Sequence, residues 1–75
     1  MKGIKITNNI RKLRFFNNEM TQQQLAEMVG ASRQTIVAVE AEKYTPSLEL
    51  AFKIAHAFNV EIGDVFMCEI QDSRK

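Results

Sequence analysis

The chain has 75 residues, of which 45% are hydrophobic and 25% are charged, and its net charge is +1. This length leaves room for one small domain but not for a second hydrophobic core, and the composition excludes a disordered chain. No apolar stretch approaches the roughly 18 residues of a membrane span, and the N-terminal residues lack the apolar run of a signal peptide. The single cysteine, Cys68, cannot form an internal disulfide, so we expect a cytoplasmic protein.

Charge is unevenly distributed along the chain. Residues 1–44 carry a net charge of +3, whereas residues 45–75 carry a net charge of −2. The excess of Lys and Arg in the first half suits a face that meets a polyanionic partner. An ordinary solvated surface explains the same distribution nearly as well, so charge alone leaves the partner open.

Both ends of the chain alternate apolar and polar residues, as half-exposed strands do. The pattern predicts short strands at Gly3–Thr7 and Phe66–Ile70 that pair antiparallel. Because an isolated two-stranded ribbon is only marginally stable in water, it would have to pack against the helices or against a second subunit. The alternative is that both termini are disordered.

A first helix is expected from about Asn8 to Asn17, with Thr7 or Asn8 as its N-cap. Helical spacing places a charged side chain, Arg14, on the inward face of this helix. The residues that share this face are Ile10, Leu13, Arg14 and Asn17.

A second helix is expected over residues 22–29. Thr21 and Gln24 have the spacing of a capping box at its start, and Gly30 supplies the left-handed residue that ends a helix. Its buried side is predicted to be Leu25, Met28 and Val29, with Ala26 small enough for a close helix contact.

A third helix is expected over residues 33–41, with Ser32 as its N-cap. At 100° per residue, Ile36 and Val39 point toward the core, and Arg33 lies at the edge of the opposite face. That outward face otherwise carries Gln34, Val37, Ala38 and Ala41. Residues 21–41 are therefore predicted to form a helix-turn-helix.

Two more helices follow an extended segment, because Pro46 disfavours helix at the residue before it. Ser47 is expected to cap a fourth helix that runs to Phe58, with Asn59 just beyond its end, and a short fifth helix covers about Ile62 to Phe66. The inward residues of the fourth helix are Leu50, Ala51, Ile54, Ala55 and Phe58.

The outward face of the third helix has the chemistry of a major-groove reader. Arg can donate two bonds to guanine, Gln can pair with adenine, and small apolar side chains can contact the thymine methyl. A solvent-facing helix more often carries Glu and Lys here, which favours an occupied face over an ordinary amphipathic surface. The predicted base-reading residues are Arg33, Gln34, Val37 and Ala38, and the predicted phosphate contacts include Gln22, Lys43 and the Tyr44 backbone.

A charged residue lies on the inward face of the first helix and another on that of the third. Because burying an unpaired charge costs free energy, Arg14 and Glu40 should form contacts with each other in so small a core. We predict an ion pair between them that sets the angle between the two helices.

Three segments in order, TQQQLAEMVGASRQTIVAVE, KYTPSLELAFKIAHAF and EIGDVF, resemble the Cro/repressor type of helix-turn-helix, the XRE family of transcriptional regulators. The resemblance covers roughly Ile10 to Phe66. It implies an all-α, five-helix, repressor-like DNA-binding domain, to which short members often add terminal strands. By the same resemblance, Gln22 contacts phosphate, and Arg33 and Gln34 read bases. The resemblance also places three residues at the groove, Thr35, Ala38 and Lys43. It further implies a buried salt bridge between Arg14 and Glu40.

Three positions depart from the family pattern. The turn 16–20 is longer than the common form and lacks its glycine, and Glu61 replaces the small cap often seen before the fifth helix. Position 38 is Ala where some members carry a polar reading residue, which puts the register of base contacts in question more than the function.

These features together predict a sequence-specific regulator of double-stranded DNA, acting as a repressor and a homodimer. With no spare domain, a dimer surface must lie on the fifth helix and the tail 67–75, with Val65, Met67 and Ile70 as candidates, unless these residues only cap the monomer core. The competing function is a protein-interaction module, such as an antitoxin-like subunit.

Catalysis is not expected, because no catalytic set or metal-ligand spacing occurs. His56 is read as a partly exposed helix residue, and Cys68 as a buried or strand thiol rather than a redox sensor. We therefore expect no cofactor, no metal and no small-molecule effector.

Overall fold

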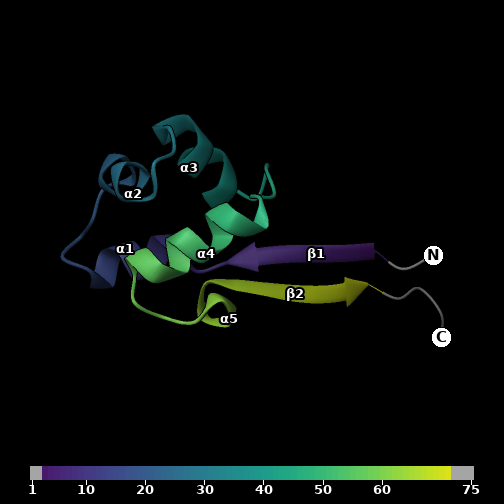
Figure 1. Cartoon of the computed structure of the whole chain (residues 1–75). Helices are drawn as coiled ribbons and strands as arrows, with labels where there is room; N and C mark the ends of the chain where they lie inside the picture. Colours follow the sequence, from purple (N-terminus) through teal and green to yellow (C-terminus); the bar gives the residue numbers. More distant parts are fainter. Residues whose placement is uncertain (1–2, 72–75) are drawn as a thin grey trace.

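The computed structural model describes residues 3–71 (Figure 1). Within that range the order of elements is strand, five helices, strand. Their bounds are β1 (Gly3–Asn8), α1 (Ile10–Phe16), α2 (Gln22–Val29), α3 (Arg33–Glu40), α4 (Leu48–Ala57), α5 (Ile62–Val65) and β2 (Phe66–Gln71).

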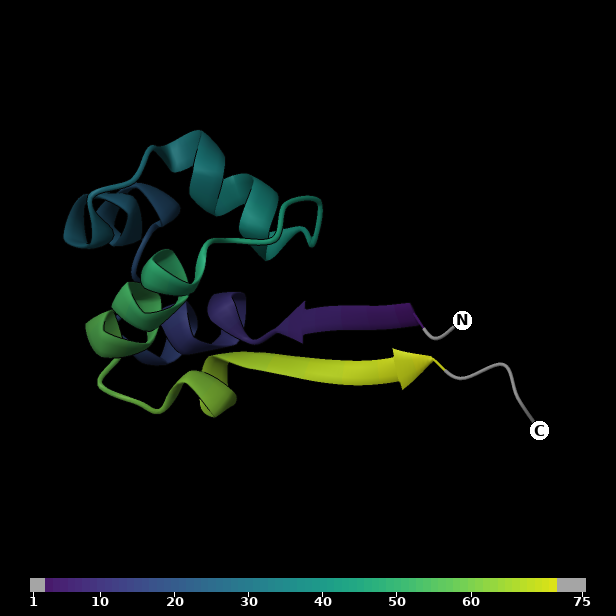
Figure 2. The same ribbon diagram turned by 45° about the vertical axis from the view of Figure 1, so that its right-hand side comes forward.

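The helices form a body from which the two strands project as a ribbon (Figures 1 and 2). The ribbon makes the molecule elongated, with extents of 44 × 21 × 19 Å. In both views the free ends of β1 and β2 lie together at the far end of the ribbon, away from α2 and α3.

The strands pair antiparallel along their whole length, from Gly3 opposite Gln71 to Asn8 opposite Phe66. The predicted terminal strands are therefore confirmed, and the prediction of an all-α fold with at most a possible ribbon is correct only for the body. The first helix is shorter than predicted, because Asn8 ends β1 instead of beginning α1. The Asn8 side chain nevertheless acts at the helix start, where its Oδ1 accepts from the Ile10 N–H at 3.1 Å.

Side-chain caps begin three of the helices, as predicted. At α2 the Gln24 N–H donates to Thr21 Oγ1 at 3.0 Å, and the Thr21 N–H donates to Gln24 Oε1 at 2.8 Å. Ser32 Oγ accepts from the Thr35 N–H, and Ser47 Oγ from the Leu50 N–H, both at 3.1 Å. These bonds satisfy N–H groups that the helix itself leaves unpaired, so local sequence sets where α2, α3 and α4 begin.

Left-handed residues end the helices and shape the turns. Gly30 closes α2 with φ of 71°, and Asn59 follows α4 with φ of 59°. In the glycine-free turn between α1 and α2, Asn18 and Glu19 take this conformation instead, with φ of 59° and 54°. The departure of this turn from the family pattern is therefore accommodated by residues other than glycine.

The core lies between the helices and is built from small and medium apolar side chains. The prediction that Met28 lies in this core is wrong, since Met28 is 56% exposed. It lines a surface hollow between α2 and α4 together with Phe52 and His56. The buried residues are Ile10, Leu25, Ala26, Val29, Ile36, Val39, Ala51, Ile54, Ala55, Phe58 and Val65.

Candidate nucleic-acid interface

The third helix presents one face to the core and the other to solvent. Ile36 and Val39 are buried, whereas Arg33 and Gln34 at the start of the helix are exposed. Val37 is also exposed and Ala38 is half-buried. The four predicted base-reading residues therefore leave part or all of their side-chain surface open to a partner.

An ion pair joins α1 to α3 behind this face. Arg14 Nε donates to Glu40 Oε1 at 3.1 Å, and Arg14 Nη2 donates to Glu40 Oε2 at 2.8 Å. The two side chains are only 16% and 12% exposed. A two-point contact between a guanidinium and a carboxylate fixes orientation as well as distance. The predicted pair is thus present and holds α3 at a set angle to α1.

Both residues of the pair also form hydrogen bonds with residues at the start of the helix-turn-helix. Arg14 Nη1 donates to the Met20 carbonyl at 2.8 Å, and Gln22 Nε2 donates to Glu40 Oε1 at 3.4 Å. Gln22, the predicted phosphate contact, is therefore half-buried and held against the carboxylate. It remains at the N-terminus of α2, where backbone N–H groups and the helix dipole favour an anion.

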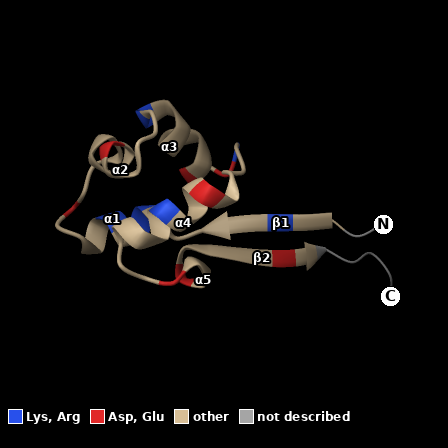
Figure 3. Cartoon of the chain, in the orientation of Figure 1, with Lys and Arg blue, Asp and Glu red and all other residues tan. Residues whose placement is uncertain are grey.

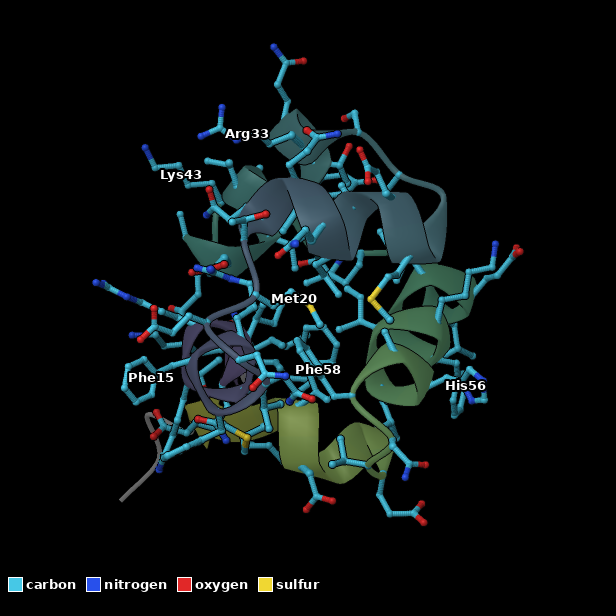
Figure 4. All side chains as sticks on the ribbon, turned by 90° about the vertical axis from the view of Figure 1, so that its left-hand side faces the viewer. Phe15, Met20, Arg33, Lys43, His56 and Phe58 are labelled. Atoms are coloured by element: carbon cyan, nitrogen blue, oxygen red, sulfur yellow. The ribbon has the colours of Figure 1, made fainter. Side chains whose placement is uncertain are left out.

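The loop after α3 places the other predicted phosphate contacts. Glu42 has φ of 65°, and the Lys43 N–H donates to the Ala38 carbonyl at 2.9 Å. This left-handed closure turns the chain sharply and leaves the side chains of Lys43 and Tyr44 exposed. Figure 4 shows Arg33 and Lys43 reaching out on the same side of the molecule, opposite to His56.

Thr35 is bound into the cap of α3 rather than free. Its hydroxyl lies 2.9 Å from Ser32 Oγ, and its backbone N–H donates to that oxygen. The side chain is half-buried. Thr35 can meet phosphate only from this capped position at the start of the helix.

Sequence reasoning missed Arg11, an exposed residue of α1. Arg11 shares one open hollow with Gln22, Arg33 and Glu40, and a second with Val37. The signal available was that Arg11 is a cation in the basic half of the chain, three residues before the residue predicted to pair with the third helix.

The three residues predicted at a dimer interface lie in different environments. Val65 is 0% exposed inside the protomer, so it has no surface to offer a second copy, and that assignment is wrong. Met67 is half-buried, and its Sδ lies 3.7 Å from Asn9 Nδ2. Ile70 is 64% exposed near the end of the ribbon and stays a candidate.

Both signs of charge occur across the structure. Figure 3 shows basic residues on α1, on β1 and at the start of α3, and acidic residues on α2, at the end of α3, on α5 and on β2. Within residues 3–71 no group of three or more potential metal ligands comes together. Cys68 is exposed on β2 rather than buried, and no described helix is long and apolar enough to cross a membrane.

Comparison with known proteins identifies the architecture. The family model described as helix-turn-helix matches residues 10–65, which run from the start of α1 to the end of α5 and leave both strands outside. Among similar proteins is an uncharacterized HTH-type transcriptional regulator of Methanocaldococcus jannaschii. It is 52% identical over 60 residues, covering 77% of this chain and 91% of that protein.

Two further relatives extend the comparison. An uncharacterized HTH-type transcriptional regulator of Archaeoglobus fulgidus is 51% identical over 53 residues, which cover 71% of this chain and 75% of that protein. One from Bacillus subtilis is 49% identical over 49 residues, covering 65% of this chain and 74% of that protein. The chain therefore belongs to the XRE-type helix-turn-helix family of DNA-binding transcriptional regulators.

Proposed function

We propose that this protein is a sequence-specific repressor that reads double-stranded DNA as a homodimer, with α3 in the major groove. The observation that carries the proposal is the exposed N-terminal end of α3. There Arg33 and Gln34 are open to solvent, while the Arg14–Glu40 pair holds the helix from behind. Membership of the family favours this function over the alternative of an antitoxin-like interaction module.

Base reading is proposed to divide along α3. Arg33 has the donor geometry to hold guanine O6 and N7, and Gln34 can pair with adenine N6 and N7. Val37 and Ala38 lie further along the outward face and offer apolar contact to a thymine methyl. Their small size lets the helix backbone approach the bases closely.

Backbone contacts are proposed to flank the reading helix on both sides. Gln22 and the N-terminus of α2 would hold one phosphate, with Thr35 at the start of α3. Lys43 and Tyr44 would hold another in the loop beyond α3. Arg11 extends the basic surface beside Gln22 and Arg33, so it is proposed as an additional phosphate contact.

Dimerisation is proposed because the footprint of a single helix-turn-helix on DNA is small. One helix-turn-helix covers few base pairs, and two copies that read half-sites about 34 Å apart supply the specificity that one lacks. A helix-turn-helix protein bound at its site excludes other proteins from it, and repression is the proposed consequence.

The test is selection of DNA sites from a random pool, followed by titration of the selected site at several salt concentrations. Specific binding should weaken steeply with salt, with a slope of about −0.9 per phosphate neutralised. Lys43→Ala should weaken binding to all sequences alike and flatten the slope by about one unit. Failure to select any site, or binding that does not respond to salt, would contradict the proposal.

A further inference from the structure

One side chain at the base of the ribbon joins α1 to the end of α3. β1 ends at Asn8, and Figures 1 and 2 show this end of the strand beside the end of α3. Asn8 Nδ2 donates to the Val39 carbonyl at 3.0 Å and, more weakly, to the Glu40 carbonyl at 3.4 Å. The Oδ1 of the same amide accepts from the Ile10 N–H at 3.1 Å.

The orientation of this amide is set by its partners. A backbone N–H can only donate, so the Ile10 N–H must face the oxygen of the Asn8 side chain. The nitrogen then faces α3, where the last carbonyls of a helix have no partner within the helix. An N–H donor also suits the negative end of the helix dipole. The contact is therefore a side-chain cap on the C-terminus of α3.

Asn8 is itself held in place by the elements around it. It pairs with Phe66 across the ribbon, and Phe66 packs against the core. The next residue is attached as well, because the Asn9 N–H donates to the Val65 carbonyl at 2.9 Å. The Asn8 side chain therefore starts from a fixed position, as a residue must if it is to hold another element.

The last turn of α3 is attached to the rest of the protein at two different points. The Arg14 guanidinium binds the side chain of Glu40, whereas Asn8 binds the backbone of the same turn. An attachment through the Glu40 side chain alone lets the side-chain torsion angles absorb a change in the tilt of the helix. A second attachment, made to the backbone, removes this freedom.

We infer that Asn8 is a positioning residue for base reading, which fixes the tilt of α3. This role rests on the proposed function. The helix has eight residues and is about 12 Å long, so a tilt of about 5° from its first turn moves its last turn by about 1 Å. Groups that recognise a ligand must be held within about 0.5 Å. A tilt of this size therefore changes how the second half of α3 meets the bases.

The residues most affected are those nearest to Asn8. Val37 and Ala41 line one open hollow together with Asn8, and Val37 is a proposed contact to a base. Arg33 lies at the other end of α3, beside the Ser32 cap, and moves least when the helix tilts. Loss of the Asn8 cap should therefore alter base preference at positions other than the one that Arg33 reads.

The test compares Asn8→Asp with Asn9→Asp. Aspartate at position 8 keeps an oxygen for the Ile10 N–H but turns a second oxygen toward the carbonyls of α3. Asn9 is the matched control, because it is adjacent and half-buried and its Nδ2 donates to the Asp64 carbonyl at 3.2 Å. Both variants lose an amide donor and add the same charge beside the same hollow, but only Asn8→Asp releases α3.

The first readout is base preference, which a loss of stability alone does not change. In Asn8→Asp the ratio of affinities for the best and the worst base should fall at least threefold at one or more positions of the selected site, other than the position that Arg33→Ala identifies. Asn9→Asp should keep every ratio within twofold of the wild-type value. Unchanged ratios at these positions in Asn8→Asp, or equal changes in the two variants, would overturn the inference.

The second readout is amide hydrogen exchange in the free protein, which does not depend on DNA. The Lys43 N–H donates to the Ala38 carbonyl at 2.9 Å and so reports on the last turn of α3. Its exchange, relative to that of amides in α4, should be at least fivefold faster in Asn8→Asp and unchanged in Asn9→Asp. An unchanged relative rate in Asn8→Asp would also overturn the inference.

A second variant separates the lost cap from the added charge. Asn8→Ser is neutral and too short to reach the carbonyls of α3, so it should shift base preference and exchange in the same direction as Asn8→Asp. If Asn8→Ser behaved as wild type, charge and not the cap would be the cause, and the inference would fall. Failure of the wild-type protein to select a DNA site would contradict the proposed function, while the exchange rates would still decide whether Asn8 holds α3.

Discussion

The helical body and the ribbon are stabilised in different ways. In the body, residues such as Leu25, Ile36 and Ile54 are fully buried, and side-chain caps begin α2, α3 and α4. The ribbon relies on backbone pairing between β1 and β2 and leaves Ile4 and Ile70 largely in solvent. The body is complete within one chain, as a rigid reading helix requires, whereas the ribbon has an apolar surface that the chain does not cover.

The largest effect should come from the core of the body. Leu25→Ala removes a fully buried side chain and should lower the free energy of unfolding by about 3 kcal/mol. The matched change in the ribbon, Ile70→Ala, should cost less than about 0.5 kcal/mol in the monomer. Denaturant unfolding at low protein concentration measures both, and similar costs for the two variants would remove the distinction between body and ribbon.

The next largest effect should come from the ion pair behind α3. Arg14→Met leaves the Glu40 carboxylate, 12% exposed, without its partner, and should cost about 2 kcal/mol of unfolding free energy. Combining it with Glu40→Leu should recover most of this loss, because two apolar side chains can replace a buried pair. If Arg14→Met alone left the stability unchanged, the pair would not hold α3 in place.

A smaller loss is expected at the cap of α2. Thr21→Ala removes the acceptor for the Gln24 N–H and should cost about 1 kcal/mol. Thr45→Ala is the control, because Thr45 is an exposed residue of the loop before Pro46 and should change stability by less than about 0.5 kcal/mol. Thermal unfolding of the two variants side by side checks the difference, and equal midpoints would show that the capping box contributes little.

The smallest effect should be a gain in stability in the loop after α3. Glu42 has φ of 65°, which costs a side-chain-bearing residue about 1 kcal/mol. Glu42→Gly relieves this strain but gives up more chain entropy on folding, so a net gain of about 0.5 kcal/mol is expected. Glu42→Ala should bring no such gain, because alanine meets the same restriction on φ, and a destabilised glycine variant would argue against strain at this position.

Much of the body could be predicted from the sequence because its signals are local. Capping residues act on N–H groups two or three positions away, so Thr21, Ser32 and Ser47 mark where helices begin without knowledge of the fold. The pairing of Arg14 with Glu40 was also predictable, because two inward charges in one small core have few other partners.

The errors occurred where a residue's environment depends on distant parts of the chain. Met28 has the helical spacing of a core residue, yet α4 covers only the neighbouring part of α2, and Met28 is left at the edge beside Phe52. Val65 is apolar whether its partner is its own core or a second copy, and the sequence does not distinguish the two. The length of the ribbon depended on the register between two ends of the chain, which local pattern does not specify.

The central claim, that the start of α3 reads bases, is tested most directly by comparing the binding of wild-type protein and Arg33→Ala to every single-base variant of the selected site. We predict that Arg33→Ala loses discrimination at one base position in each half-site, by about 1–3 kcal/mol, and keeps it elsewhere. An equal loss of affinity across all variants, with the pattern of preference unchanged, would contradict the account, because Arg33 would then contact the DNA backbone and not a base.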